Sequence, residues 1–426
     1  MNLLTRKKFK NTVKFSTATS LTVLLTACNI FTPEPSKTHI GTDGDDVMTG
    51  TNGLDTFKSS PGADRIDGLY EGLFFEKPDV VDYSGSNAGV TVYLNGSAGK
   101  GGHAEGDVLL NIHDLIGSDF NDVLEGNDKN NKLDGGAGDD ILRGGGAQDI
   151  LIGGAGADVL DGGSGVDIAD YSTSTAAVTV NLTANSGIGG DAQGDTFASV
   201  EYITGSNYDD VLTGDAADNL IVGGKGADKI DGAAGDDSVS YKASNSKVIV
   251  DLALKTGVGG DAQGDVLYSI ENVYGSQYND IINGDVAANY ISGENGDDII
   301  SGEGGNDTLT GDAGDDILNG NDGNDSLNGG TGNNQLNGGA GFDVADITQS
   351  SDAALGFSIQ KFSNKIVVIS SIATDSIHSV EQLAMGTKTI DIKNIYSDLS
   401  LADQLQFNGE ADFLSWLGNG YNYEGL

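Results

Sequence analysis

The pattern of apolar and polar positions repeats every nine residues along much of this chain. Residues 135–170 form four consecutive units of the form G-G-x-G-x-D-x-U-x, in which U is usually a large aliphatic residue. Position 8 of each unit is apolar, so it can supply the buried side chain of a short β-strand. Glycine at positions 1, 2 and 4 favours a tight turn, because glycine adopts positive φ without steric cost. Each unit therefore predicts one turn followed by one short strand.

The same frame extends over four arrays of units that keep a constant register. They cover residues 41–67, 117–170, 205–240 and 275–346 and hold three, six, four and eight units. Position 8 is apolar in all 21 units, whereas position 6 is aspartate in 17 of them and asparagine in four. A solvated acidic surface would not keep this pattern, so the aspartates are expected to share a structural role.

A second, longer unit separates the arrays. Its three copies begin at Tyr83, Tyr171 and Tyr241. Each contains a strand with alternating apolar residues, then a loop of sequence GGHAEGD in the first copy and GGDAQGD in the other two, and each ends at a Gly-Ser pair. A degenerate fourth copy begins at Ile347. The intervals between successive starts differ by whole pairs of nonapeptides, so these units have been gained or lost two at a time. Paired insertion keeps the alternation between two faces, which predicts one full coil for every two nonapeptides.

The nonapeptides resemble RTX, or haemolysin-type, calcium-binding repeats. The longer unit resembles the repeat modules attached to mannuronan C5-epimerases. The resemblance implies an all-β fold, a right-handed parallel β-roll, and multiple Ca²⁺ ions as cofactors. Such a stack needs a cap over its last strand edges, and residues 347–426 are expected to provide this C-terminal β cap. Aspartate is a hard oxygen ligand of the kind that Ca²⁺ prefers. The ligands implied at position 6 are Asp46, Asp55, Asp64, Asp122, Asp140, Asp149, Asp158, Asp167, Asp210, Asp228, Asp237, Asp280, Asp298, Asp307, Asp316, Asp325 and Asp343.

The asparagines at position 6 predict weaker sites. Asn131, Asn219 and Asn289 each occupy the second unit of an array, where the preceding coil belongs to the longer unit. An aspartate there would be a poorly compensated charge, whereas an amide is neutral and can still donate a hydrogen bond. We expect the gaps at these three residues and at Asn334 to bind calcium weakly or not at all.

The N-terminus predicts export. Basic residues from Arg6 to Lys14 precede a short, moderately apolar stretch that is too short and polar to span a membrane. Residues 25–28, Leu-Thr-Ala-Cys, resemble the lipobox of bacterial lipoproteins, which implies that Cys28 is lipidated and anchors the chain to the outer membrane. The alternative is secretion into the medium. The expected segments are a signal peptide (1–27), a tether (28–40), the first array with an insertion (41–82), three modules (83–170, 171–240 and 241–346) and a degenerate cap with a tail (347–426), in which a helix is expected from Asp403 to Leu417.

The net charge limits which classes of molecule this chain is expected to bind. The chain has 22 Lys and Arg against 64 Asp and Glu, a formal net charge of −42. Such acidity disfavours nucleic acid and anionic lipid as binding partners. It should also destabilise an empty roll by repulsion between stacked aspartates, so calcium binding and folding are expected to be coupled.

Catalytic motifs are not evident. The four histidines are scattered, and neither H-E-x-x-H nor G-x-S-x-G occurs. The pairs Asp191/Asp195 and Asp261/Asp265 could act as glycosidase carboxylates, but their repetition in register favours a structural or additional calcium role. We expect a non-enzymatic, calcium-binding β-roll lipoprotein at the cell surface, serving as a binding or spacer module. The alternatives are an accessory polysaccharide-binding protein and an adhesin. An aromatic or basic stripe on one face would favour polysaccharide binding, but the sequence shows no such stripe.

Overall fold

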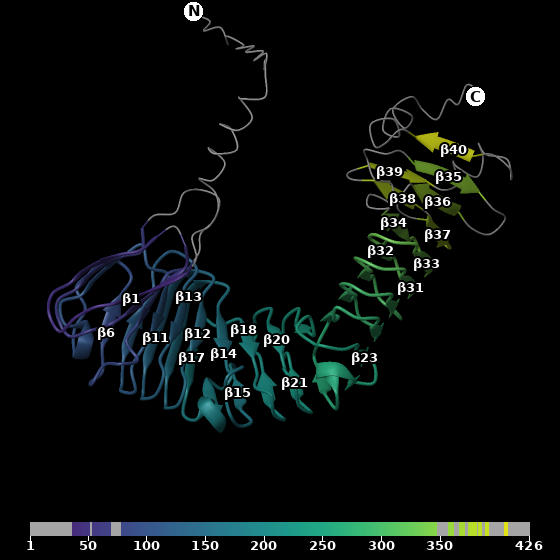
Figure 1. Ribbon diagram of the computed structural model, residues 1–426. Helices are drawn as coiled ribbons and strands as arrows, with labels where there is room; N and C mark the ends of the chain where they lie inside the picture. Colours follow the sequence, from purple (N-terminus) through teal and green to yellow (C-terminus); the bar gives the residue numbers. More distant parts are fainter. Residues whose placement is uncertain are drawn as a thin grey trace, which may run out of the picture.

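The computed structural model describes residues 36–51, 53–69 and 78–346, and shorter stretches between 357 and 407. Figure 1 shows short strands stacked coil upon coil into a curved rod, with its first and last coils at opposite ends. Cys28, the signal peptide and most of the insertion at 69–77 lie outside the described residues. In the part of the chain that the structure describes, no helix has the length and hydropathy of a membrane span.

Equivalent strands on neighbouring coils are two nonapeptides apart, as the paired insertions predict. On one face, β10 (Lys132–Asp134) pairs in parallel with β12 (Ile150–Ile152). On the other face, β9 (Val123–Glu125) pairs in parallel with β11 (Ile141–Ala147) with the same shift. Strands that follow one another in sequence therefore lie on opposite faces, and the prediction of a parallel β-roll is confirmed.

One face of the roll is a single 17-stranded sheet, here called the continuous sheet. Most of its strands span three residues, and the middle residue of each such strand points into the core. Besides β10 and β12 it contains β1 (Lys37–Ile40), β3 (Asp55–Lys58), β5 (Val80–Asp82), β8 (Asp114–Ile116), β14 (Ile168–Asp170), β18 (Tyr202–Thr204), β20 (Leu220–Val222), β22 (Ser238–Ser240), β26 (Asn272–Tyr274), β28 (Tyr290–Ser292), β30 (Thr308–Thr310), β32 (Ser326–Asn328), β34 (Val344–Asp346), β38 (Gln382–Met385) and β39 (Lys388–Asp391).

The opposite face, here called the divided face, consists of three sheets. The first contains β2 (Val47–Thr49), β4 (Arg65–Asp67) and β7 (Val108–Leu110), and the second contains β6 (Thr91–Tyr93), β9, β11, β13 (Val159–Gly165) and β17 (Thr196–Ala198). The third contains β15 (Thr179–Asn181), β16 (Ser186–Ile188), β19 (Val211–Thr213), β21 (Lys229–Asp231), β23 (Ile249–Asp251), β24 (Thr256–Val258), β25 (Val266–Tyr268), β27 (Ile281–Asn283), β29 (Ile299–Ser301), β31 (Ile317–Asp322), β33 (Gln335–Ala340), β35 (Phe357–Lys361), β36 (Ile366–Ser370), β37 (Thr374–His378) and β40 (Gln404–Phe407).

The longer units modify the divided face. In the second copy, β15 pairs antiparallel with β16 and parallel with β19 of the following array, whereas β17 pairs back to β13 of the preceding array. A short 3₁₀ turn connects β16 to β17. The three copies of this turn are η2 (Gly102–Ala104), η3 (Gly190–Ala192) and η4 (Gly260–Ala262). Each longer unit thus adds a hairpin on one face while the continuous sheet runs past it.

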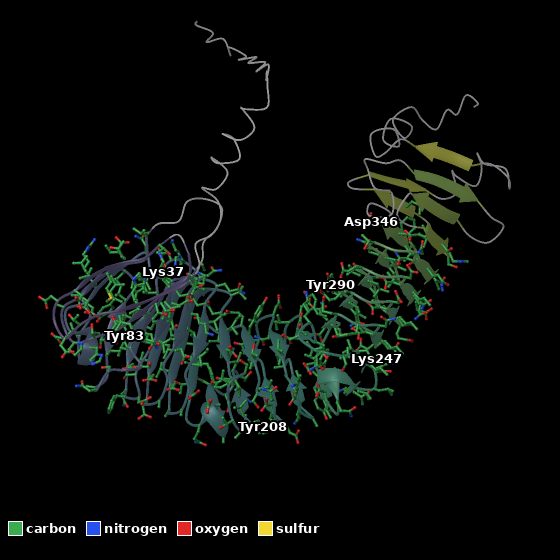
Figure 2. The ribbon with its side chains drawn as sticks, viewed as in Figure 1. Lys37, Tyr83, Tyr208, Lys247, Tyr290 and Asp346 are labelled. Atoms are coloured by element: carbon green, nitrogen blue, oxygen red, sulfur yellow. The ribbon has the colours of Figure 1, made fainter. Side chains whose placement is uncertain are left out.

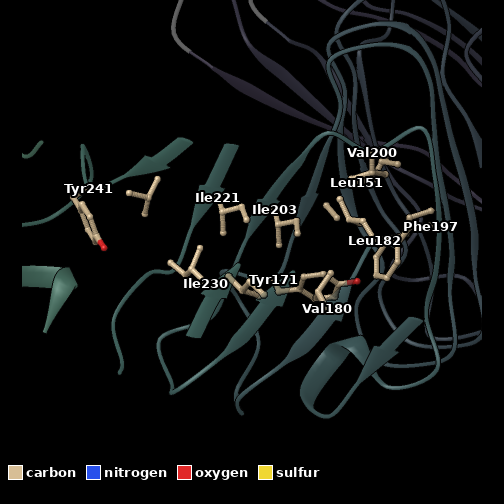
Figure 3. Close-up of a cluster of buried hydrophobic side chains, with 14 of the residues drawn as sticks. Leu151, Tyr171, Val180, Leu182, Phe197, Val200, Ile203, Ile221, Ile230 and Tyr241 are labelled. Atoms are coloured by element: carbon tan, nitrogen blue, oxygen red, sulfur yellow. The ribbon is translucent and has the colours of Figure 1, made fainter. Parts of the chain in front are cut away.

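The core is a narrow layer between the two faces. Position 8 is buried in all 21 nonapeptides, and the longer units add larger side chains such as Tyr171 and Phe197 (Figure 3). Burying one large aliphatic side chain contributes about 1.5–3 kcal/mol. The nine-residue period is therefore the period of this core, repeated once on each face of every coil.

The C-terminal strands extend both faces. β37 pairs in parallel with β33, and β38 pairs in parallel with β34, so the last nonapeptides are covered on each side. Beyond them, β36, β35 and β40 add antiparallel pairings. The expected helix from Asp403 is wrong at its start, because Gln404–Phe407 pairs with β35 as a strand; residues 408–417 lie outside the described residues.

Candidate metal centre

The position-6 side chains form a ladder of hydrogen bonds along each edge of the roll. Each position-6 side chain, together with the backbone N–H group that it accepts, is here called a rung. The backbone N–H of Asp122 donates to Oδ1 of Asp140 at 2.7 Å, and the N–H of Asp140 donates to Oδ1 of Asp158 at 2.8 Å. The N–H of Asp298 donates to Oδ1 of Asp316 in the same way, at 2.9 Å. All five aspartates are buried. One carboxylate oxygen thus ties each coil to the coil before it, and the other remains for a second partner.

At many rungs that second oxygen, Oδ2, is buried and has no hydrogen-bond partner among the described residues. A buried carboxylate oxygen without a partner is costly, so its position calls for a positive charge beside it. The aspartates with this arrangement are Asp140, Asp149, Asp158, Asp167, Asp228, Asp237, Asp298, Asp307, Asp316 and Asp325.

Backbone carbonyl groups lie close to these loops. A Cβ atom on Gly154 would lie 2.0 Å from the carbonyl oxygen of Gly136, and one on Gly156 would lie 1.8 Å from that of Gly138. Glycine is needed at both positions because each loop stacks directly on carbonyl groups of the loop before it. No group of three or more His, Cys, Asp or Glu side chains that could hold a metal occurs in the described ranges. A metal here would combine carboxylate and backbone oxygens, a ligand set that Ca²⁺ accepts.

The pKa values of these aspartates are raised. Burial, together with the charges of nearby carboxylates, raises the pKa of Asp140 to about 7 and the pKa values of Asp158 and Asp298 to about 8. Hydrogen bonds from the backbone of the preceding coil lower these pKa values but do not offset the burial. The protein alone therefore disfavours the charged form of these side chains, and a bound divalent cation would stabilise it.

Comparison with known families supports calcium as this cation. The model of the RTX calcium-binding nonapeptide repeat matches residues 40–69, 116–151, 138–169, 204–239, 274–309 and 310–345. The repeats belong to the RTX calcium-binding family. The matched segments are the four arrays, and the longer units lie between them. No curated protein matches this chain.

Some predicted calcium ligands of the RTX units already have protein partners for Oδ2. Ser206 donates its backbone N–H to Oδ2 of Asp210 at 2.6 Å, and its hydroxyl also contacts this carboxylate. Ser276 bonds Asp280 in the same way. The other aspartates with a Ser or Thr donor at position 2 of their unit are Asp46, Asp55, Asp64 and Asp122. Sixteen of the 17 predicted ligands therefore fall into two groups with different bonding of Oδ2. The remaining one, Asp343, is buried, and its Oδ1 accepts the N–H of Asp325 at 3.0 Å.

The asparagines of the second RTX units use their amide groups as donors. Nδ2 of Asn131 donates to the carbonyl oxygen of His113 at 2.7 Å. Asn219 and Asn289 bond the carbonyl oxygens of Glu201 and Glu271 at 2.9 and 2.8 Å. These acceptors belong to the longer units, so the amide connects an array to the coil before it, as the sequence suggested. Weak calcium binding beside these residues stays a prediction.

The longer units contribute rungs that the sequence interpretation missed. The N–H of Asp158 donates to Oδ1 of Asp195 at 2.9 Å, and the hydroxyl of Tyr171 donates to Oδ2 of Asp195 at 2.7 Å. The tyrosine thus takes the place where other rungs have an unpartnered oxygen. The corresponding pairs are Tyr83 with Asp107 and Tyr241 with Asp265. The separation from Tyr to Asp is the same in all three copies, and this constancy was available as a signal.

This bonding bears on the acid pairs considered as glycosidase carboxylates. Asp195 and Asp265 are buried, and each accepts one backbone and one tyrosine hydrogen bond. Their pKa values are raised to about 6 by burial, and the hydrogen bonds lower them. Both carboxylates therefore connect coils, which favours the structural interpretation of these pairs.

Proposed function

We propose that this chain is a non-enzymatic, calcium-loaded β-roll that works outside the bacterial cell as a binding or spacer module. A lipid on Cys28 would hold it at the outer membrane with the roll exposed to the surroundings. The export signal and the tether predicted from the sequence support this location, and the curved rod of stacked coils suits a display role (Figure 1).

The buried, unpartnered Oδ2 atoms carry this proposal. Each would be left as an uncompensated acceptor in the absence of metal, and successive rungs place such charges above one another. Calcium would remove both penalties, so binding and folding would be one process. Extracellular calcium modules bind with dissociation constants of about 10⁻⁴–10⁻³ M. A roll in this range would fold where calcium is abundant and stay unfolded before export.

Chelation tests the proposal. In excess EDTA the mature protein should lose most of its β-sheet signal in far-UV circular dichroism, and added Ca²⁺ should restore it cooperatively. Mg²⁺ at the same concentration is the control, because it demands octahedral geometry and dehydrates reluctantly. A spectrum that chelation leaves unchanged would refute calcium-dependent folding.

A second candidate function, polysaccharide binding, is favoured by the outer surface of the continuous sheet. Tyr202, Tyr274 and Tyr290 all point outward from this sheet. The rings of Tyr274 and Tyr290 are 5.7 Å apart, and Nζ of Lys242 lies 4.3 Å from the centre of the Tyr274 ring. Tyr274 and Tyr290 lie on the neighbouring strands β26 and β28, whereas β20 and β22 separate Tyr202 from them.

A hollow of about 300 Å³ is lined by Tyr202 and Tyr274, and also by Asp218 and Asp236. Aromatic rings beside hydrogen-bonding carboxylates can hold the apolar and polar sides of a sugar ring. Glycan-array binding in calcium tests this candidate. Tyr274→Ala should remove binding, whereas Tyr208→Ala, on the convex side of the rod opposite Tyr290, should retain it (Figure 2). Equal binding by both variants would count against the tyrosine surface.

A further inference from the structure

The nonapeptides have two loop conformations, which differ at position 2. Gly136 has a φ of 95° and Ala233 has a φ of 76°, whereas Ser118 and Ser206, at the same position of other units, are not among the residues with positive φ. We call a loop open when position 2 has positive φ and closed when it does not. The residues with positive φ at position 2 are Gly136, Gly145, Gly154, Gly163, Gly224, Ala233, Glu294, Glu303, Asp312, Asn321, Gly330 and Gly339.

The two conformations differ in the hydrogen bonds that the position-6 side chain accepts. In closed loops, position 2 donates a hydrogen bond to the side-chain oxygen at position 6, as Asn127 does to Asn131 at 2.8 Å and Asp215 does to Asn219 at 2.7 Å. The carboxylates whose Oδ2 has no hydrogen-bond partner among the described residues lie in open loops. Asp237, which follows Ala233, is an example. The turn of the backbone at position 2 therefore decides whether the protein itself fills the place beside this oxygen.

Open and closed loops follow a positional rule. The first two units of every array are closed, and the first array, residues 41–67, is closed throughout. All later units of the second, third and fourth arrays are open, which gives four, two and six open loops. The first coil of these three arrays stacks on a longer unit, which offers no nonapeptide loop. An open loop thus occurs only where a nonapeptide loop lies directly before it in the stack.

Residue type alone does not explain the rule. Asp312 is open with a φ of 65°, whereas Asp215 and Asp285 at the same position are closed. Positive φ is sterically unfavourable for a residue other than glycine. Ala233 and Glu294 bear this cost as well. The open conformation therefore needs a compensating interaction, and the neighbouring loop would provide it together with a shared cation.

We propose that calcium is bound only at the open loops whose position 6 is aspartate, eleven in all, in three separate stacks of four, two and five. The twelfth open loop carries Asn334, whose Oδ1 accepts the N–H of Asp316, so that it has an amide Nδ2 in place of a carboxylate Oδ2. The closed coil at the start of each stack and the whole first array would be held by protein hydrogen bonds in place of metal. This inference rests on the proposed function, since it assumes that the roll binds calcium. It departs from the family match, which includes the first array at residues 40–69.

A matched pair of variants tests the assignment in the third array. Ala233→Thr should close its loop, because a β-branched residue avoids positive φ and the threonine can bond Asp237 as Thr51 bonds Asp55. Ala233→Gly should keep the loop open. Native mass spectrometry in calcium should count eleven ions in the wild type, ten in Ala233→Thr and eleven in Ala233→Gly. An unchanged count in Ala233→Thr would overturn the role of position 2.

Anomalous diffraction from calcium-bound crystals locates the ions in the wild-type protein, so the test does not depend on how a variant folds. Strong peaks are expected beside Asp140, Asp228 and Asp298 and not beside Asp122 or Asp210. Peaks at Asp122 and Asp210 equal to those at the open loops would refute this inference while leaving calcium-dependent folding intact. A protein that binds no calcium and folds in EDTA would instead refute the proposed function.

Discussion

Replacing Tyr171 by phenylalanine removes the tyrosine hydrogen bond from Asp195, the carboxylate of the second longer unit. The ring of Tyr171 is buried in the core, and its hydroxyl donates to Oδ2 of Asp195 (Figure 3). Phenylalanine would keep the ring and its packing but leave this buried oxygen without a donor. Oδ1 of Asp195 would still accept the N–H of Asp158. The substitution therefore removes one charged hydrogen bond and little else.

The expected cost follows from the charge and burial of the acceptor. A hydrogen bond to a charged group contributes about 1.5–3 kcal/mol, and leaving a buried charged acceptor unsatisfied brings the loss toward the upper end of this range. Water does not readily replace the hydroxyl, because Asp195 is buried. We expect Tyr171→Phe to lower the free energy of unfolding by about 2–3 kcal/mol at saturating calcium.

Urea unfolding followed by circular dichroism, with calcium in excess, measures this loss. Tyr208→Phe is the matched control, because Tyr208 is 47% exposed and its substitution should change stability by less than about 0.5 kcal/mol. The calcium count should be the same in both variants, since the change removes no metal ligand of an open loop. Equal stability of the two variants would show that the Tyr171–Asp195 bond does not hold the coils together.

Three further substitutions test the core, the metal rungs and the anchor. Leu318→Ala should cost about 2–5 kcal/mol because it leaves a cavity in the core, whereas Val286→Ala, at an 88% exposed side chain, should be nearly neutral in urea unfolding. Asp298→Asn should lower the number of bound calcium ions in mass spectrometry, whereas Asp280→Asn, in a closed loop, should leave that number unchanged; equal losses would contradict the two loop classes. Cys28→Ser should abolish palmitate labelling and release the protein from membranes, and continued labelling would disprove the lipid anchor.

The sequence predicted the repeating parts of the fold because their physical cause is local. Position 8 must be apolar to be buried, and the loops stack too closely for a Cβ atom at positions such as Gly154 and Gly156, so each nonapeptide has an apolar residue and at least one glycine. The coil of two nonapeptides followed from the spacing of the longer units. The stacking of Asp140 on Asp158 also follows directly once the coil length is known.

Contacts between different kinds of unit could not be predicted in this way. The bond from Tyr171 to Asp195 depends on how a longer unit folds back onto the array before it, which the nonapeptide frame does not define. The outward tyrosines Tyr202 and Tyr290 are aligned only after the strands on both sides of a longer unit are assigned to one sheet. The strand at Gln404–Phe407 is likewise set by pairing with distant β35, which outweighed the local helical pattern.

The two loop classes give a physical reason for the gain or loss of nonapeptides in pairs. One added coil of two nonapeptides contributes one loop to each edge of the roll, and both stack on nonapeptide loops, so both can be open. The closed coil at the start of the array and the Tyr–Asp rung of the next longer unit stay as they were. The four, two and six open loops of the three arrays accordingly differ by two or four. Length and calcium capacity would therefore change together, while the metal-free ends that fix the register of each stack are retained.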